Sequence, residues 1–225
     1  MRVGKVLRWI AAMAGLVGLV AIVPAVADIN VQLKDGSVVK VPVNKEDVVS
    51  ISFEDSASGG SDGMTWDFET GDLRGWTASG DAFTYQPTFG DNPTARNRGQ
   101  ASKHEGEYWV GGYEKRPSPT DPAGQIQGDG PQGTLISQSF TIKMPTISLL
   151  VGGGCDPNTV YVELVVDKQS VIKTTGKCTE TMERAFWSVK PFMGRTAQIR
   201  IVDASSGGWG HINVDDVRFL AAVTK

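Results

Sequence analysis

The sequence predicts an all-β chain whose main domain is an antiparallel β-sandwich or jelly roll. Short apolar segments of strand length recur along the second half of the chain, at residues 134–142, 146–151, 159–166, 171–175, 186–189, 197–203 and 211–219. Turn-forming residues separate these segments, and the 27 glycines are typical of a turn-rich β protein. Because no segment shows the 3.6-residue period of an amphipathic helix, the spacing favours a sandwich of short strands.

The first 27 residues have the pattern of a secretory signal peptide. Three basic residues lie within the first eight, an apolar run follows over residues 10–23, and small residues end the segment at Ala27. The run is short for a membrane-spanning helix, which needs about 20 residues. We therefore expect cleavage after Ala27, membrane contact only before cleavage, and a secreted or periplasmic, cell-envelope location.

Three further segments follow the signal peptide. Residues 28–54 are expected to form a small β-hairpin or meander, because alternating apolar residues lie on both sides of the Asp35-Gly36 turn signal. Residues 55–63 are rich in Ser and Gly, which is typical of a flexible linker. The sandwich domain is expected to occupy residues 64–221.

The two cysteines, Cys155 and Cys178, are expected to form a disulfide. An even number of cysteines in an exported chain favours a bridge. The two residues lie outside the arms of a predicted hairpin whose turn, at residues 167–170, is near their midpoint. A bridge between them would close the open end of that hairpin and stabilise the fold by about 3 kcal/mol.

Charge and motif content exclude several classes of function. A net charge of −3 gives no field that would attract nucleic acid. The chain has two histidines, His104 and His211, and neither lies in a nucleophile or zinc motif. The run Gly152-Gly153-Gly154 lacks the lysine and helix of a phosphate-binding loop, and instead indicates closely packed backbones. We therefore expect no enzyme activity.

Carboxylates at both ends of the sandwich domain are candidate calcium ligands. Glu69 and Asp72 lie near its start, and Asp215 lies on its last predicted strand. The first and last strands of such domains are usually neighbours, so that their oxygens could share one Ca²⁺, which takes 6 to 8 oxygen ligands. The alternative is that these carboxylates are solvated charges at strand edges.

Aromatic and polar residues that suit a sugar ligand gather in two places. A sugar ring stacks its apolar face on Trp or Tyr, and polar side chains bond its hydroxyls. The irregular stretch between residues 80 and 133 and the loop Gly208-Trp209-Gly210 supply both kinds of residue. The predicted ligand-binding residues are Asp91, Arg96, Tyr108, Trp109, Trp209 and His211. Three other tryptophans, Trp66, Trp76 and Trp187, are expected in the core, and Trp109 fits either role.

Three stretches of the sequence together resemble a known accessory domain. They are Asp67-Phe68-Glu69-Thr70-Gly71-Asp72-Leu73-x-Gly75-Trp76, Leu149-x-Val151-Gly152-Gly153-Gly154 and Gly208-Trp209-Gly210-His211-Ile212-Asn213-Val214-Asp215. The pattern covers about residues 65–220 and is similar to the galactose-binding-like β-sandwich attached to levanases and other fructan hydrolases of glycoside hydrolase family 32. The motifs Asn-Asp-Pro-Asn-Gly, Arg-Asp-Pro and Glu-Cys, which carry the chemistry of those enzymes, are absent from the sequence. The resemblance therefore implies the accessory fold and glycan binding without hydrolysis.

Two hypotheses of function follow from these observations. The first is a secreted, non-catalytic carbohydrate-binding module, whose partner is a glycan. The alternative is a structural or protein-interaction domain of the cell envelope that uses the sandwich as a scaffold and residues 28–54 for docking. A hydrolase with an unrecognised site is a third possibility, and it requires titratable groups that converge in one pocket.

Overall fold

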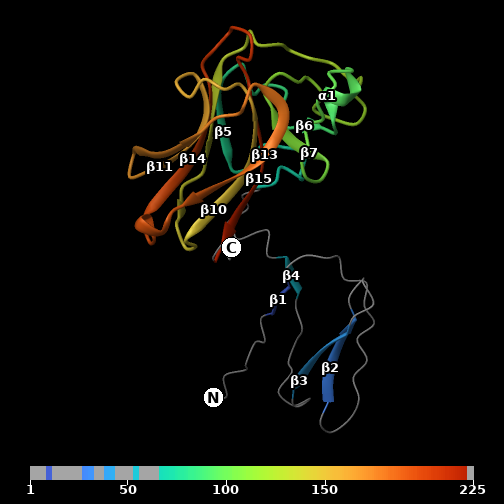
Figure 1. The fold of residues 1–225 in the computed structure, drawn as a ribbon, viewed down its shortest axis with the longest axis vertical. Helices are drawn as coiled ribbons and strands as arrows, with labels where there is room; N and C mark the ends of the chain where they lie inside the picture. The colour runs from blue at the N-terminus through green and yellow to red at the C-terminus, as the bar shows by residue number, and fades with distance from the viewer. Residues whose placement is uncertain (1–8, 12–26, 33–37, 44–52, 56–65, 222–225) are drawn as a thin grey trace. The chain divides into compact units, whose positions relative to one another are not determined.

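The computed structural model describes residues 9–11, 27–32, 38–43, 53–55 and 66–221 of the 225-residue chain (Figure 1). The chain divides into two compact units, Met1–Ala57 and Ser58–Lys225. The division falls within the segment predicted to be a linker, most of which lies outside the described residues.

The first unit contains two short strand pairs. Strand β2 (Ala27–Gln32) pairs antiparallel with β3 (Val38–Val43), in agreement with the predicted hairpin, and β1 (Trp9–Ala11) pairs parallel with β4 (Phe53–Asp55). Most of the predicted signal peptide lies outside the described residues, and its cleavage stays a prediction. In the part of the chain that the structure describes, no helix is long and apolar enough to cross a membrane.

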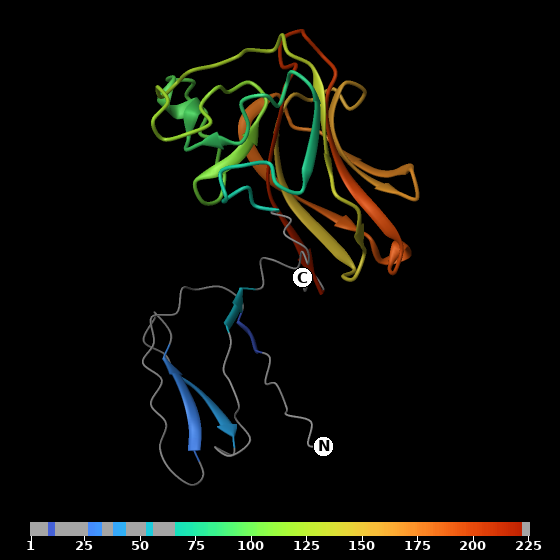
Figure 2. The ribbon, with the colours of Figure 1, turned by 180° about the vertical axis from the view of Figure 1, so that it is seen from behind.

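The second unit is an antiparallel β-sandwich, which confirms the predicted fold class (Figures 1 and 2). One sheet has the strand order β13-β10-β15-β7-β6 and the other β12-β11-β14-β8-β5, with β9 paired to β14. The strands are β5 (Trp76–Gly80), β6 (Thr88–Phe89), β7 (Tyr108–Gly111), β8 (Gly133–Ser137), β9 (Phe140–Thr141), β10 (Thr146–Gly153), β11 (Val160–Val166), β12 (Gln169–Thr174), β13 (Thr179–Ser188), β14 (Thr196–Asp203) and β15 (Ile212–Leu220).

The core lies between the two sheets and is built from the alternate residues along the strands of both sheets that face inward. The predicted core tryptophans Trp66, Trp76 and Trp187 are all buried in it. The two ends of the domain also meet there, because the N–H of Val217 donates to the carbonyl oxygen of Trp66 at 2.9 Å and the rings of Trp66 and Phe219 lie 4.9 Å apart. Burial of this apolar surface is the main term that stabilises the sandwich.

Two strand predictions were wrong in extent. The segment predicted as one strand at 134–142 forms two, β8 and β9, because the pairing with β14 shifts by one residue between Ile136 and Phe140. At this irregularity the N–H of Ile199 donates to the side-chain hydroxyl of Ser137. Strand β13 starts at Thr179, seven residues before the predicted strand at 186–189. The missed half is rich in polar residues because β13 is the outer strand of its sheet, so its sequence lacks the apolar run that marks a buried strand.

The predicted disulfide is confirmed, with Cys155 and Cys178 bonded across a Cα separation of 5.0 Å. It closes the open end of the hairpin formed by β11 and β12. The turn of that hairpin is the pair Asp167-Lys168, and both residues have positive φ, as a two-residue hairpin turn of the primed type requires.

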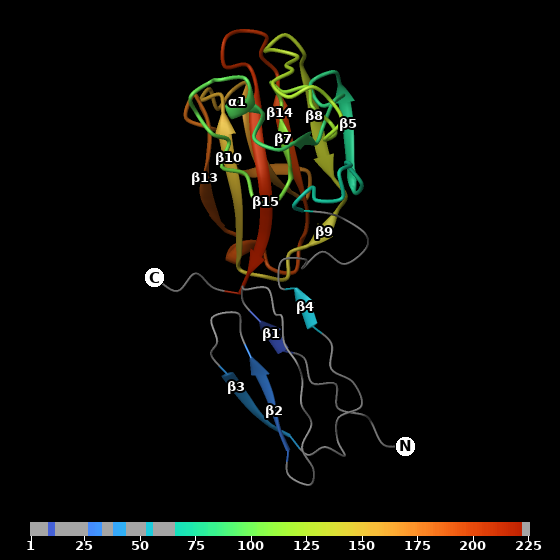
Figure 3. The same cartoon turned by 90° about the vertical axis from the view of Figure 1, so that its right-hand side faces the viewer.

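Irregular segments gather at the end of the sandwich where β15 begins (Figure 3). They include a short helix that the sequence did not indicate, α1 (Asn92–Ala95), whose first turn is capped by the Asp91 side chain. The connection between β7 and β8 spans residues 112–132 and is held mainly by turns and side-chain hydrogen bonds. These loops, together with the start of β13, form the walls of the candidate site.

Candidate functional site

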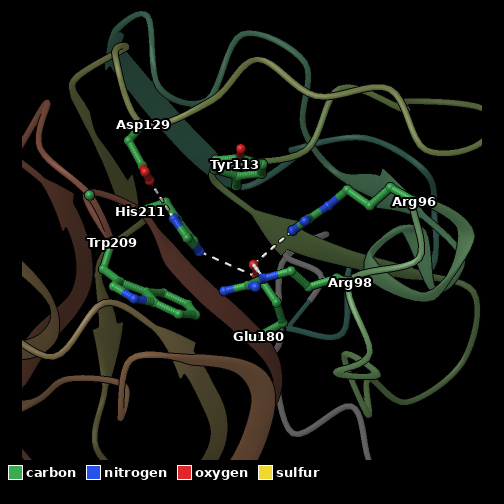
Figure 4. Close-up of a pocket in the computed structure, with 8 residues that line it drawn as sticks. Arg96, Arg98, Tyr113, Asp129, Glu180, Trp209 and His211 are labelled. Carbon is green, nitrogen blue, oxygen red and sulfur yellow. Dashed lines mark hydrogen bonds and ion pairs between the residues drawn. The ribbon is translucent and has the colours of Figure 1, made fainter.

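A pocket of about 310 Å³ opens among these loops (Figure 4). Its walls come from the end of α1, the segment after β7, the start of β13 and the loop before β15. The lining residues are Arg96, Arg98, Tyr113, Asp129, Glu180, Gly208, Trp209 and His211. All but one of them carry a polar or aromatic side chain.

His211 forms the back of the pocket and is held between two carboxylates. Its Nδ1 lies 2.6 Å from Oδ1 of Asp129, and its Nε2 lies 3.3 Å from Oε2 of Glu180. A carboxylate on each ring nitrogen favours the imidazolium, because both nitrogens then donate. Burial alone would lower the pKa of His211, but the hydrogen bonds that its ring donates to Asp129 and Glu180 outweigh this effect and raise the pKa to about 9.

Glu180 joins the histidine to an arginine. Its Oε1 accepts a hydrogen bond from Nη2 of Arg96 at 2.7 Å, while Oε2 faces His211 and the side-chain amide of Asn213. Burial would raise the pKa of this carboxyl, but the bonds to His211 and Arg96 lower it to about 2. Glu180 is therefore ionised and fully partnered at neutral pH.

The guanidinium of Arg96 is also occupied by contacts within the protein. Besides Glu180, its guanidinium bonds the buried carboxylate of Glu114, at 2.9 Å from Nη2 to Oε1, and it lies 4.6 Å over the ring of Tyr113. Glu114 in turn accepts a hydrogen bond from Asn92, the first residue of α1. This chain of contacts fixes the loop walls of the pocket relative to each other.

Arg98 and Asp129 have polar atoms that remain available. Nε of Arg98 is 3.6 Å from Glu180, a long contact, and 41 % of the side chain is exposed. Its guanidinium lies 5.2 Å from the Trp209 ring centroid. Among the described residues, the terminal nitrogens of Arg98 and Oδ2 of Asp129 have no hydrogen-bond partner, so that the pocket offers a donor and an acceptor to a ligand.

Trp209 forms one wall and has a constrained backbone. Its φ is 63°, in the left-handed region, which costs a bulky residue about 1–3 kcal/mol and is typical of functional sites. The ring lies 5.5 Å from that of His211 and is partly exposed. The backbone packs so closely on Gly154, the residue that follows β10, that a Cβ there would collide with the carbonyl oxygen of Trp209. The Gly152–Gly154 run thus has the role that the sequence indicated, a close approach of backbones.

The structure brings together half of the predicted ligand-binding residues. Arg96, Trp209 and His211 line the pocket. Asp91 and Tyr108 do not line it: Asp91 caps α1 and binds Ser102, and the partly buried Tyr108 packs against the core.

The prediction for Trp109 as a sugar-stacking residue was wrong. Its side chain is fully buried with Leu150 and Met182, and its Nε1 donates to the carbonyl oxygen of Gly90. A buried ring has no free face for a sugar, and Trp109 therefore has the core role that the sequence left open.

Two lining carboxylates, Asp129 and Glu180, were missed by the sequence analysis. Asp129 stands alone in a Gly- and Gln-rich loop, which gives no periodic signal. Glu180 lies in the half of β13 that was not predicted. Its position two residues after Cys178 was the available signal, since the disulfide fixes that segment beside the Gly152–Gly154 run.

The candidate calcium ligands are partly brought together. Glu69 accepts from the N–H groups of Glu107 and Tyr108, and Asp215 accepts from that of Glu105, so both carboxylates face one short segment. Asp72 instead forms an ion pair with Arg74, which does not suit a ligand. No group of three or more acidic, His or Cys side chains in the described ranges is placed to hold a metal. Calcium binding by Glu69 and Asp215 stays a prediction.

One curated protein is similar in sequence to 72 % of this chain. The chain matches no protein-family model. It is 32 % identical over 166 residues to an Aspergillus rugulosus protein named "Putative glycosyl hydrolase ecdE"; the match covers 72 % of this chain and 22 % of that protein. The chain thus spans about a fifth of the length of this curated relative.

Several solved β-sandwiches are similar at low identity. One is TmCBM61 in complex with β-1,4-galactotriose, with 20 % identity, coverage of 71 % of this chain and 99 % of that one, and a TM-score of 0.41. Another is the K1 cleaved adhesin domain of Lys-gingipain from Porphyromonas gingivalis, with 11 % identity, coverage of 70 % and 96 %, and a TM-score of 0.37.

Proposed function

We propose that this chain is a secreted, non-catalytic carbohydrate-binding domain whose ligand site is the pocket beside Trp209. The proposal rests on one observation: a partly exposed tryptophan and unpaired polar atoms line the same pocket. Trp209 is held there in a left-handed backbone conformation, beside the free polar atoms of Arg98 and Asp129. Sugar sites need this combination of an aromatic surface and a few fixed polar groups. The disulfide supports an oxidising, extracellular location.

The charges in and behind the pocket favour a neutral sugar. Arg96, Arg98 and His211 are cations, and Asp129, Glu180 and Glu114 are carboxylates, so that equal numbers oppose each other at short range. A neutral ring would accept hydrogen bonds from Arg98 and donate a hydroxyl proton to Oδ2 of Asp129 without leaving a charge unpaired. A uronate or a sulfated sugar would add a negative charge that nothing in this set balances.

The same contacts argue against hydrolysis in the pocket. A glycosidase needs a carboxyl that is protonated at working pH beside a second carboxylate. Glu180 is ionised and bound to Arg96 and His211, and Oδ1 of Asp129 is taken by His211. Asp203, whose pKa burial raises to about 7, is 2 % exposed and does not line the pocket, so that it cannot protonate a bound sugar. We propose that the chain contributes binding, as an accessory domain of fructan hydrolases would, and that any hydrolysis belongs to a separate catalytic domain.

A glycan array tests the proposal. The immobilised set contains neutral glycans, fructans among them, together with uronate-containing and sulfated ones, and the Trp209→Ala variant is screened beside the natural chain. Phe186→Ala is the matched control, because Phe186 is also an aromatic of the sandwich, is 55 % exposed and does not line the pocket. Binding to a neutral glycan that only Trp209→Ala loses would support the proposal.

The scaffold function remains the second candidate and has one observation in its favour. Phe186 exposes its ring on β13, which is the outer strand of its sheet, and an exposed apolar group at a sheet edge suits protein docking. An array on which the folded chain binds nothing would favour this function. Capture of a cell-envelope protein that Phe186→Ala fails to capture would establish it.

A further inference from the structure

The two halves of the pocket lie on segments that are far apart in the sequence. Glu180 is the second residue of β13, whereas Trp209 and His211 belong to the loop before β15. Strand β10 lies between them in the sheet and pairs with both β13 and β15. The relative position of the two halves therefore depends on the end of β10 next to the pocket.

That end of β10 contacts the tryptophan half directly. The N–H of Gly154 donates to the carbonyl oxygen of His211 at 2.7 Å. A Cβ on Gly154 would collide with the carbonyl oxygen of Trp209, and a Cβ on Gly153 would collide with that of His211. A shift of this backbone would consequently be transmitted to both side chains.

The disulfide joins this backbone to the glutamate half. Cys155 follows Gly154, and Cys178 precedes Glu180 by two residues. A second contact between the same two segments lies beside the bridge, where the hydroxyl of Thr175 donates to the carbonyl oxygen of Gly154 at 2.9 Å. The register between β10 and β13 shifts between Val151 and Gly153, so that the ladder is irregular at the point that the bridge spans.

We propose that the Cys155–Cys178 disulfide is a positioning element of the pocket, which keeps Glu180 in contact with His211 and thereby shapes the ligand site. This inference rests on the proposed function for its consequence in binding, but the contact that it explains can be measured without a ligand. A disulfide that acted only by lowering the entropy of the unfolded chain would stabilise the domain, and its reduction would leave the pocket of the folded protein unchanged.

Reduction is a clean perturbation in this chain. The sequence contains two cysteines, so a reductant breaks one covalent bond, and Cys155 is exposed to it. A dithiol reagent such as dithiothreitol transfers two electrons and two protons to the bridge. The products are the two cysteine thiols and the cyclic disulfide of the reagent.

The test is an NMR pH titration of the His211 ring in the full chain, oxidised and reduced. The oxidised chain should titrate near its pKa of about 9. Loss of the Glu180 contact should move that midpoint down by at least about one unit, and the affinity for a glycan identified on the array should fall at least about tenfold. An unchanged His211 midpoint in folded, reduced protein overturns the inference.

Two controls keep the outcomes distinct. Val189→Ala keeps the bridge but removes apolar packing at a fully buried position next to the far end of β13, and it should leave the His211 midpoint in place. If reduction unfolds the chain, the titration is repeated in trimethylamine N-oxide, which favours the folded state. A reduced chain that still does not fold would overturn the inference, because the bridge would then hold the whole domain. If oxidised protein binds no glycan, the proposed function fails while the titration still decides this inference.

Discussion

Replacing Asp203 with asparagine should stabilise the domain at neutral and higher pH. Asp203 ends β14, is 2 % exposed, and its Oδ2 has no hydrogen-bond partner among the described residues. Burial raises the pKa of this carboxyl from 3.8 to about 7, the nearby Asp129 adds to the rise, and Ser205 and His211 oppose it. The folded chain therefore binds a proton more tightly here than the unfolded chain does.

The sign and size of the effect follow from linkage. Between pH 3.8 and about 7 the unfolded chain has lost this proton and the folded chain retains it, so the free energy of unfolding falls as pH rises. A shift of about three units corresponds to about 4 kcal/mol at most. Because the new amide must also be buried, at a cost of about 1–3 kcal/mol, we expect a net gain of about 1–3 kcal/mol for Asp203→Asn near pH 8.

Urea unfolding at about pH 4 and pH 8 measures this gain. Asp81→Asn is the control, since Asp81 is exposed and no side-chain hydrogen bond holds it in the described structure. The stabilisation by Asp203→Asn should appear at the higher pH and vanish or reverse at the lower one. An equal change at both pH values would refute the assignment of a buried, protonated carboxyl.

Three further predictions concern the core, the charge network and calcium. Trp109→Ala should lower the free energy of unfolding by about 3–5 kcal/mol in urea titrations yet leave glycan affinity of the folded protein unchanged; a selective loss of binding would contradict its core role. The ion pairs of His211 should stabilise the fold fully below pH 6.5 and progressively less as pH rises through about 9. His211→Gln should therefore lower the free energy of unfolding most at low pH. A loss of stability that does not depend on pH would be evidence against the imidazolium. If Glu69 and Asp215 hold Ca²⁺, the ion should raise the melting temperature measured by calorimetry and Glu69→Gln should abolish that rise; equal melting temperatures with calcium and with a chelator would exclude the site.

The sequence carried enough information for the fold because the sandwich depends on local patterns. Alternating apolar residues and turn signals placed most strands of both sheets, and the midpoint of the β11–β12 hairpin placed the disulfide. The pattern failed at β13, where an outer strand alternates between polar residues and a few buried ones, and at α1, which is too short to show a period. It also left β5, β6 and β7 unassigned, because these strands have five residues at most.

The site was predictable in part, because some of its residues lie in a loop with a recognisable composition and others reach the pocket only through the fold. Trp209 and His211 lie in a glycine-rich loop whose composition indicates exposure, and both line the pocket. Glu180 and Asp129 reach the pocket through tertiary structure alone, 31 and 82 residues from His211 along the chain. Trp109 shows the converse, since an aromatic residue in an irregular stretch can as well be buried as exposed.

The most direct test of the proposed function is NMR titration of the indole N–H signals with a neutral glycan that the array identifies. The Trp209 signal should shift in proportion to the bound fraction, because its ring lines the pocket, whereas the signal of the fully buried Trp109 should stay in place. Binding that leaves Trp209 unmoved while signals elsewhere in the sandwich shift would contradict the placement of the sugar site in this pocket.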